Sequence, residues 1–226
     1  MAQPPGPLRH GYHAELDQLR LQVELMGLRV EENLARMRRV LGDGDGATME
    51  AALAADDDID AMNCSLTERC YDLLARQAPV ASDLRFVVSV IRVIAELERV
   101  GDLALRIVKL GPDVGLLASA GEAWRILLAV VDEAIERHHR ALTAWSTQDL
   151  ALASEVATTP CPLDAHHPHL VAELRRIEGP EAVRTAMGLL VAGQAADRIA
   201  DHAAVIGARI RYLVTGEARH LAAEVR

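Results

Sequence analysis

Two stretches of the 226-residue sequence share one arrangement of side chains: ELERVGDLALRI at 96–107 and AADRIADHAAVI at 195–206. Each contains an acid, an arginine, a branched apolar residue, a small residue and a second acid, among apolar neighbours. Residues four positions apart lie on the same face of an α-helix, one turn apart. The pattern therefore predicts two helices that are copies of each other, each with a pair of acids on one face.

The duplication extends beyond these two helices. A constant offset aligns Glu98 with Asp197 and Asp102 with Asp201, and a slightly larger offset aligns Asp60 with Asp164. Matching segments in the same order indicate repeated structural units. We therefore predict two three-helix repeats, at 8–110 and 119–216, related by a pseudo-twofold axis within one elongated domain.

Composition and periodicity predict an all-α protein. Half of the residues are apolar, and the chain has 1 Phe, 2 Trp and 3 Tyr. Leu, Ala and Arg, which are frequent here, lose little on entering a helix. Pro160, Pro162 and Pro168 cannot all lie in a regular helix interior, so we expect the fifth segment to be broken or to start late. Periodic apolar positions separated by turn residues define six long helical segments: 8–41, 47–77, 81–110, 119–147, 149–177 and 181–215.

Charge and hydropathy narrow the class of protein. The formal net charge is −9, and no run of Lys and Arg with interleaved aromatic residues is present, so nucleic acid is not expected as a partner. The first residues lack the basic and apolar regions of a secretory leader, and no apolar run approaches the length of a membrane span. We expect a cytoplasmic protein that does not insert into a membrane.

The duplicated acids continue an apolar stripe. On a helical wheel Glu98 and Asp102 share a face with apolar residues that include Leu84, Val88 and Ile91. Like charges one turn apart repel, and burying them without a partner is costly, so a positive group is expected nearby. The second helical segment also has acids four residues apart, and its packing beside the third predicts one cluster of four: Asp56, Asp60, Glu98 and Asp102.

Two kinds of positive group could neutralise the paired acids. Arg99 and Arg198 adjoin the acids and Arg106 lies one turn beyond Asp102, so an arginine network is one solution. A metal ion is the other, because carboxylates one turn apart can bind or bridge cations in helical bundles. A metal-free helical scaffold follows from the first solution, and a metal-binding protein follows from the second.

Three stretches resemble the PhoU family of phosphate-transport and phosphate-signalling regulators: ADDDIDAMNCSLTERCYDLLARQAP at 55–79, ASDLRFVVSVIRVIAELERVGD at 81–102 and AADRIADHAAVIGARIRYLVTGE at 195–217. The resemblance covers nearly the whole chain in order. It implies two three-helix bundles and multinuclear iron, or zinc or another divalent metal, on the acid-x-x-x-acid motifs. It also implies a cytoplasmic protein, often a homodimer, that couples the ATPase subunit of the phosphate ABC transporter to a sensor histidine kinase. Its net effect would be negative regulation of phosphate-starvation signalling when phosphate is plentiful.

The resemblance assigns metal-ligand roles with two departures. Asn63 stands where the family commonly has a glutamate, and Pro160 stands where the second repeat should have an acid. Nearby histidines at 166, 167 and 169 are a speculative replacement, since imidazole suits iron and zinc. The residues expected to bind metal are Asp56, Asp60, Glu98, Asp102, Asp164, Asp197 and Asp201, with Asn63, His166, His167 and His169 as further candidates.

A carboxylate-bridged di-iron oxidoreductase is the alternative from another class. Such enzymes use Glu-x-x-His pairs, and the chain contains Glu136 with His139 and Glu217 with His220. However, the second pair follows the expected end of the last helix, and the two pairs are not at duplicated positions. A glycine-rich phosphate loop, a nucleophile elbow and an HExxH motif are all absent from the sequence. We therefore predict a regulator and no enzymatic activity.

Overall fold

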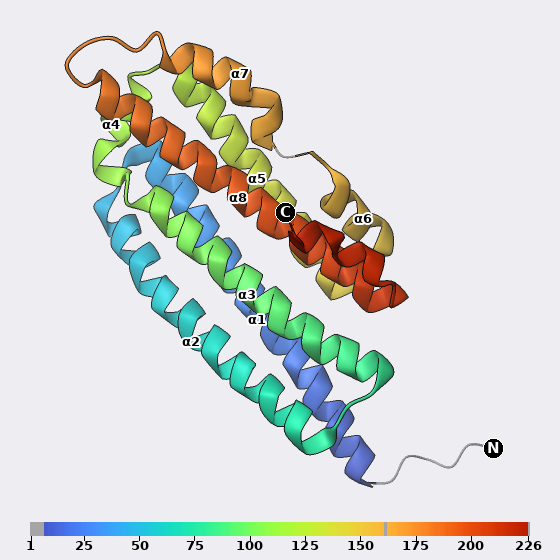
Figure 1. Ribbon diagram of the computed structural model, residues 1–226. Coiled ribbons are helices and arrows are strands. Elements are labelled where there is room, and N and C mark those ends of the chain that lie inside the picture. The colour runs from blue at the N-terminus through green and yellow to red at the C-terminus, as the bar shows by residue number, and fades with distance from the viewer. Residues whose placement is uncertain (1–6, 161, 226) are drawn as a thin grey trace.

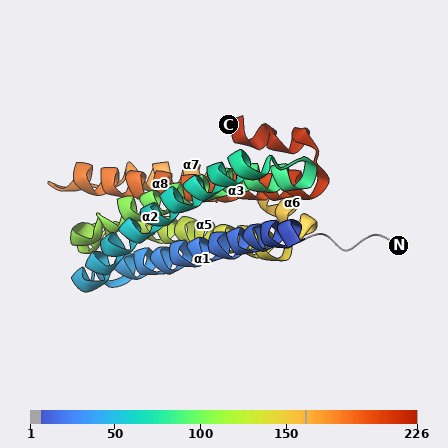
Figure 2. The ribbon, with the colours of Figure 1, turned by 90° about the horizontal axis from the view of Figure 1, so that it is seen from below.

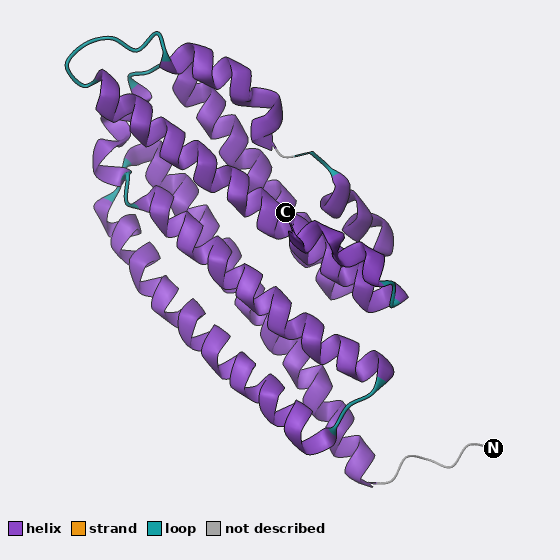
Figure 3. Cartoon of the chain, viewed as in Figure 1, coloured by secondary structure: helices purple, strands orange, loops and turns teal. Residues whose placement is uncertain are grey.

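The computed structural model describes the backbone of residues 7–160 and 162–225, and the side chains of 11–160 and 164–222. Within these ranges every regular element is helical, so the predicted all-α class is confirmed (Figure 3). The first half consists of α1 (Pro7–Asp43), α2 (Gly46–Gln77) and α3 (Ala81–Val108). The remaining elements are η1 (Gly111–Asp113), α4 (Val114–Ala118), α5 (Glu122–Thr147), α6 (Leu150–Thr158), α7 (Pro162–Leu174), α8 (Ala182–Thr215) and η2 (Ala218–Val225).

The helix count differs from six because the fifth predicted segment forms two helices, α6 and α7, and the connection after α3 contains the short helix α4. Pro160 lies between α6 and α7, and Pro162 is the first residue of α7, where its missing N–H is not needed. The expected break is therefore present. Pro168 nevertheless lies inside α7, where it removes one hydrogen bond of the helix.

The long helices form two groups of three around a shared centre. In Figure 1, α3 and α8 run antiparallel, side by side through the middle of the molecule, and α2 lies on the outer side of α3. Helix α1 packs on α2 and α3, and α5 packs on α8 and α1. Figure 2 shows α1 and α5 on the opposite side of the molecule from the C-terminal segment. The chain thus completes one three-helix group before it forms the second, and the two groups meet along α3 and α8.

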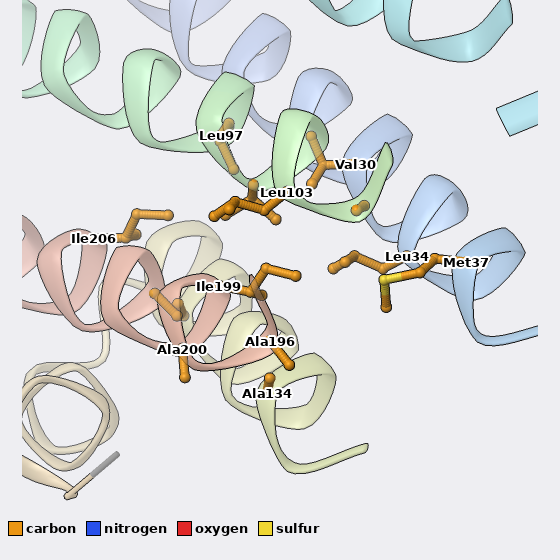
Figure 4. Close-up of a cluster of buried hydrophobic side chains, with 14 of the residues drawn as sticks. Val30, Leu34, Met37, Leu97, Leu103, Ala134, Ala196, Ile199, Ala200 and Ile206 are labelled. Carbon is orange, nitrogen blue, oxygen red and sulfur yellow. The ribbon is translucent and has the colours of Figure 1, made fainter. Parts of the chain in front are cut away.

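One hydrophobic core joins the two groups (Figure 4). Leu34 and Met37 of α1, Leu97 of α3 and Ile199 of α8 all belong to this cluster. All four side chains are buried. Because burial of apolar surface is the main favourable contribution to folding, the shared core fixes how α3 lies against α8.

Helix α6 packs very closely on α8 at Gly207. A Cβ atom there would lie only 2.8 Å from the carbonyl oxygen of Ala153. A side chain at this position would therefore separate the two backbones, and glycine permits the close approach. Beyond α8, η2 turns back along it, so the C-terminal segment lies over the α3 and α8 side of the molecule (Figure 2).

None of the described helices combines the length and the apolar character that a membrane crossing requires.

Candidate functional site

Four acids from α2 and α3 lie together on one side of the first helical group. Asp56 is close enough to Asp60, Glu98 and Asp102 for their charges to act on it. Glu98 is similarly affected by Asp60 and Asp102. The short connection between α2 and α3 makes these helices antiparallel, so acids one turn apart on each helix face each other across the pair.

Burial and the neighbouring acids raise the pKa values of Asp56 and Glu98. Burial and then the charges of Asp60 and Asp102 raise the pKa of Asp56 from 3.8 to about 6. Burial and the same two charges also raise the pKa of Glu98, against a smaller opposite effect of Arg99. Like charges that disfavour each other's ionisation in this way produce a strongly negative potential, which attracts cations.

Gly101 allows the two helices to approach at this point. A Cβ atom on Gly101 would lie 3.2 Å from Oδ1 of Asp56. The carboxylate of Asp56 is therefore packed against the backbone of α3, in a space that a side chain at position 101 would fill. This position lies between Glu98 and Asp102, so the glycine places the α2 acid directly beside the α3 acids.

The arginine alternative fails for these acids. Among the described side chains, no Arg or Lys nitrogen lies within the 4.0 Å salt-bridge distance of Asp56, Asp60, Glu98 or Asp102. Arg99 instead places Nη1 3.4 Å from Oε1 of Glu96. The four acids therefore have no guanidinium counter-charge in contact with them.

Glu96 is the buried acid of α3, and the sequence pattern missed it. Its side chain is 1% exposed, and its Oε2 lies 2.5 Å from Nδ1 of His202 on α8. Arg92 and Arg99 complete the group at 3.1 Å and 3.4 Å. Burial raises the pKa of Glu96, but the hydrogen bond and charge of His202 and the two guanidinium groups together hold it below 4.5. The position equivalent to Glu96 in the second repeat is Ala195, so the duplication gave no signal for it.

The expectation that the paired acids continue a buried apolar stripe holds only in part, because Val87 and Ile94 of that stripe are buried but other members are not. Leu84 and Val88, on the same stripe, are each 40% exposed, and Asp102 is exposed. On α8 the matching stripe is also exposed, with Met187 at 61%. Asp56 and Glu98 are half-buried. Both helices are apolar nearly all round, so the helical wheel could not tell the core face from the outer face.

The acids of the second half have different surroundings. Asp164 of α7 and Asp201 of α8 line the same cavity, and Asp197 lies half-buried one turn before Asp201. The cavity is also lined by arginines, including Arg198 and Arg137. This half therefore does not reproduce the concentration of negative charge found between α2 and α3.

The further ligand candidates separate into two groups. Asn63 is half-buried on α2, one turn after Asp60, and its Oδ1 has no hydrogen-bond partner in the described part of the chain. His166 directs Nε2 toward Oε1 of Glu133 at 3.3 Å. His167 and His169 are exposed on α7. The structure thus places the asparagine beside the first acid cluster and leaves two of the three histidines on the surface.

The residues of the di-iron alternative have other partners. His139 places Nδ1 2.7 Å from Glu31 of α1, and Glu136 is exposed. His220 pairs with Glu217 at 3.3 Å, after the end of α8. In the contacts of the described side chains, neither pair joins the acids of α2 and α3.

Comparison with known proteins identifies the family. The family sequence model of the PhoU domain matches residues 23–110 of this chain. A Pseudomonas aeruginosa protein named "phosphate-specific transport system accessory protein PhoU homolog" is 30% identical over 216 residues, which cover 93% of this chain and 88% of that protein. This chain belongs to the PhoU family. The Escherichia coli K12 accessory protein PhoU is 27% identical over 213 residues, covering 91% of this chain and 86% of that protein.

Solved structures of PhoU proteins have the same fold as this family member. The crystal structure of PhoU from Pseudomonas aeruginosa matches with a TM-score of 0.85 at 28% identity, covering 91% of this chain and 100% of that one. The phosphate transport system regulatory protein PhoU from Streptococcus pneumoniae matches with a TM-score of 0.77 at 25% identity, covering 91% and 98%. The arrangement of helices described above is therefore the PhoU fold.

The chemistry of the acid cluster fits a cation. As placed in the described part of the chain, no three His, Cys, Asp or Glu side chains have the spacing of a formed metal site. Asp60 and Asp102 are exposed, however, so their side chains are free to change rotamer and to turn toward an ion. The donor oxygens of Asp56 and Asn63 lie on the same face of α2. Carboxylate and amide oxygens without competing basic groups suit a hard metal ion.

Proposed function

We propose that this PhoU-family chain is a cytoplasmic, metal-binding regulator of phosphate uptake and phosphate-starvation signalling. Its relatives are named accessory proteins of the phosphate-specific transport system, which supports a regulatory role in transport and no enzymatic one. The observation that carries the metal-binding part is the group of four carboxylates between α2 and α3, which have no guanidinium in contact with them among the described side chains.

The first-half acids hold the metal in this proposal. Asp56 and Asp60 bind from α2, Glu98 and Asp102 bind from α3, and Asn63 adds a neutral oxygen. Two facing carboxylate pairs can bridge more than one ion, which supports a multinuclear iron centre, with zinc or another divalent metal as the alternative. The metal supplies fixed positive charge that ties the two helices together. Asp164, Asp197 and Asp201 would form a weaker second site, because Asp164 and Asp201 line a cavity that also carries several arginines.

As a regulator, the chain acts as an adaptor. One surface binds the ATPase subunit of the phosphate ABC transporter, and another binds a sensor histidine kinase, so that signalling is restrained while phosphate is plentiful. The net charge of −9 supports docking against basic patches of these partners, mainly through a faster association rate. Exposed apolar side chains on α8, Val183, Met187 and Val191, support a homodimer.

Co-purification from phosphate-replete cells tests the adaptor role. The tagged chain should recover the transporter ATPase and the kinase, and the Asp60→Asn/Asp102→Asn variant should recover less of both because its helices are no longer tied by metal. Asp58→Asn is the matched control, since this exposed acid lies on the opposite side of α2 from Asp56 and Asp60. Recovery of neither partner by the unmodified chain would contradict the proposal.

A further inference from the structure

A large basic cavity lies between α3 and α8. It has a volume of about 1330 Å³ and is lined mainly by residues of α3, α8, the end of α6 and the returning segment η2. Its walls carry six arginines from four elements: Arg92, Arg99, Arg137, Arg198, Arg211 and Arg219. The carboxylates that line it are Glu96, Asp164 and Asp201.

A smaller cavity of about 480 Å³ extends this region along α3. It shares Arg99 and Arg198 with the first and adds Arg106 and Lys109, with Asp102 as its acid. The two cavities together have twice as many Arg and Lys side chains as carboxylates, whereas the whole chain has 24 basic and 33 acidic residues. Positive charge is therefore concentrated at one place on an acidic protein, and concave walls of low dielectric strengthen its field.

Several of these cations have no counter-charge in contact with them among the described side chains. Arg198, Arg106 and Lys109 make no ion pair or side-chain hydrogen bond among the described residues. Arg211 is half-buried, and its Nε is shielded from water without any hydrogen-bond partner in the same part of the chain. A guanidinium nitrogen removed from water without an acceptor is unfavourable, so these groups favour an anion supplied from outside.

The protein also fixes positive charge at the cavity wall with its own backbone. Arg137 of α5 is buried and donates from Nη2 to the carbonyl oxygens of Val156 at 2.8 Å and Thr159 at 2.6 Å, at the end of α6. Its Nε donates to Val156 as well, at 3.1 Å. Main-chain oxygens thus help to hold this guanidinium group in position at the cavity wall.

The shape and composition of the cavity indicate which anion it suits. The guanidinium group is a planar fork that matches phosphate oxygens in pairs. Among the described residues that line the two cavities there is no Phe, Tyr or Trp, and His202 and His220 are the aromatic rings present. The volume exceeds the usual range for a small-molecule site, and the arginines are spread over α3, α8 and η2, so they suit several linked phosphoryl groups better than one phosphate ion.

We propose that this basic cavity binds a chain of condensed phosphate groups, such as tripolyphosphate, through Arg198, Arg211 and their neighbours. The inference goes beyond the proposed function, because the binding groups are arginines and a lysine, although Asp102, Asp164 and Asp201 also line the cavities. It requires neither the metal nor a partner protein. The phosphate chain is the recognised part, whether it is free or carried by a nucleotide.

Calorimetric titration of the full chain tests this site. The protein is stripped of metal and then transferred to chelator-free buffer at moderate salt, so that failure of the metal proposal does not affect the result. Tripolyphosphate should bind saturably and about tenfold or more tighter than orthophosphate, because it contacts more guanidinium groups. ATP binding as tightly as tripolyphosphate would show that the phosphate chain alone is recognised, and citrate should bind weakly.

Two variants locate the site. Arg198→Gln/Arg211→Gln should weaken tripolyphosphate binding by about tenfold or more. Arg106→Gln/Lys109→Gln should also weaken it, and because both positions are exposed this variant should fold normally. Arg29→Gln/Arg125→Gln removes the same charge from exposed ion pairs on α1 and α5 and should leave binding unchanged. No saturable binding of tripolyphosphate, or equal loss in the control, would overturn the assignment.

Discussion

Replacing one carboxylate of the acid cluster should stabilise the metal-free protein. The pKa of Asp56 is raised from 3.8 to about 6, first by burial and then by Asp60 and Asp102. At about 1.36 kcal/mol per pKa unit, ionising Asp56 at neutral pH destabilises the fold by about 3 kcal/mol at most. Asp56 is only half-buried, so screening by water reduces the expected gain for Asp56→Asn to about 1 kcal/mol. For a chain of this length that gain corresponds to a rise of about 2–4 °C in Tm.

Urea denaturation of metal-free protein above pH 7 measures this effect. Asp56→Asn should unfold at higher urea than the unmodified chain, and Asp58→Asn, an exposed acid on the opposite side of α2, should not. Added iron or zinc should reverse the order, because the variant has lost a ligand and gains less from binding. An Asp56→Asn variant that is less stable without metal would refute the claim that like charges are crowded at this position.

Three other changes test separate parts of the structure. The pKa of Glu96 is lowered in the folded state, so its ion pairs stabilise the fold above pH 4.5, and this contribution is lost as the pH falls below that value. The free energy of unfolding of Glu96→Gln should therefore depend less on pH in the acid range than that of the unmodified chain. Gly207→Ala should destabilise the chain by about 1–3 kcal/mol through overpacking against α6, as measured by thermal unfolding, whereas Gly11→Ala, in open space on α1, should not. Met187→Glu should shift a dimer toward monomer in light scattering, and an unchanged mass would exclude this face of α8 from the dimer contact.

Much of the helical framework was predictable from local chemistry. The run of acids and apolar residues at 81–110 became α3, Ala81–Val108, and the prolines at 160 and 162 ended one helix and began the next. These features depend on side-chain periodicity and on the missing N–H of proline, which act over a few residues. The short helix α4 carried no comparable signal, because five residues are too few to show a period.

The surroundings of the acids were less predictable, for a reason of geometry. The sequence placed Glu98 and Asp102 on one helical face, but α3 has apolar residues on almost every side, and only tertiary packing decides which face is outside. Glu96 became the buried acid because His202 of α8 lies opposite it, a contact between residues 106 positions apart. Contacts between residues so far apart in the sequence depend on the whole fold, and no local motif predicts them.

Elemental analysis of protein purified without chelators tests the central claim most directly. The unmodified chain should carry iron, zinc or another divalent metal, and Asp60→Asn/Asp102→Asn should lose most of it while circular dichroism shows an intact helical fold. Asp58→Asn should retain the metal. If the unmodified chain, supplied with excess iron and zinc, carries no more metal than the double variant, the acids between α2 and α3 do not form a metal site.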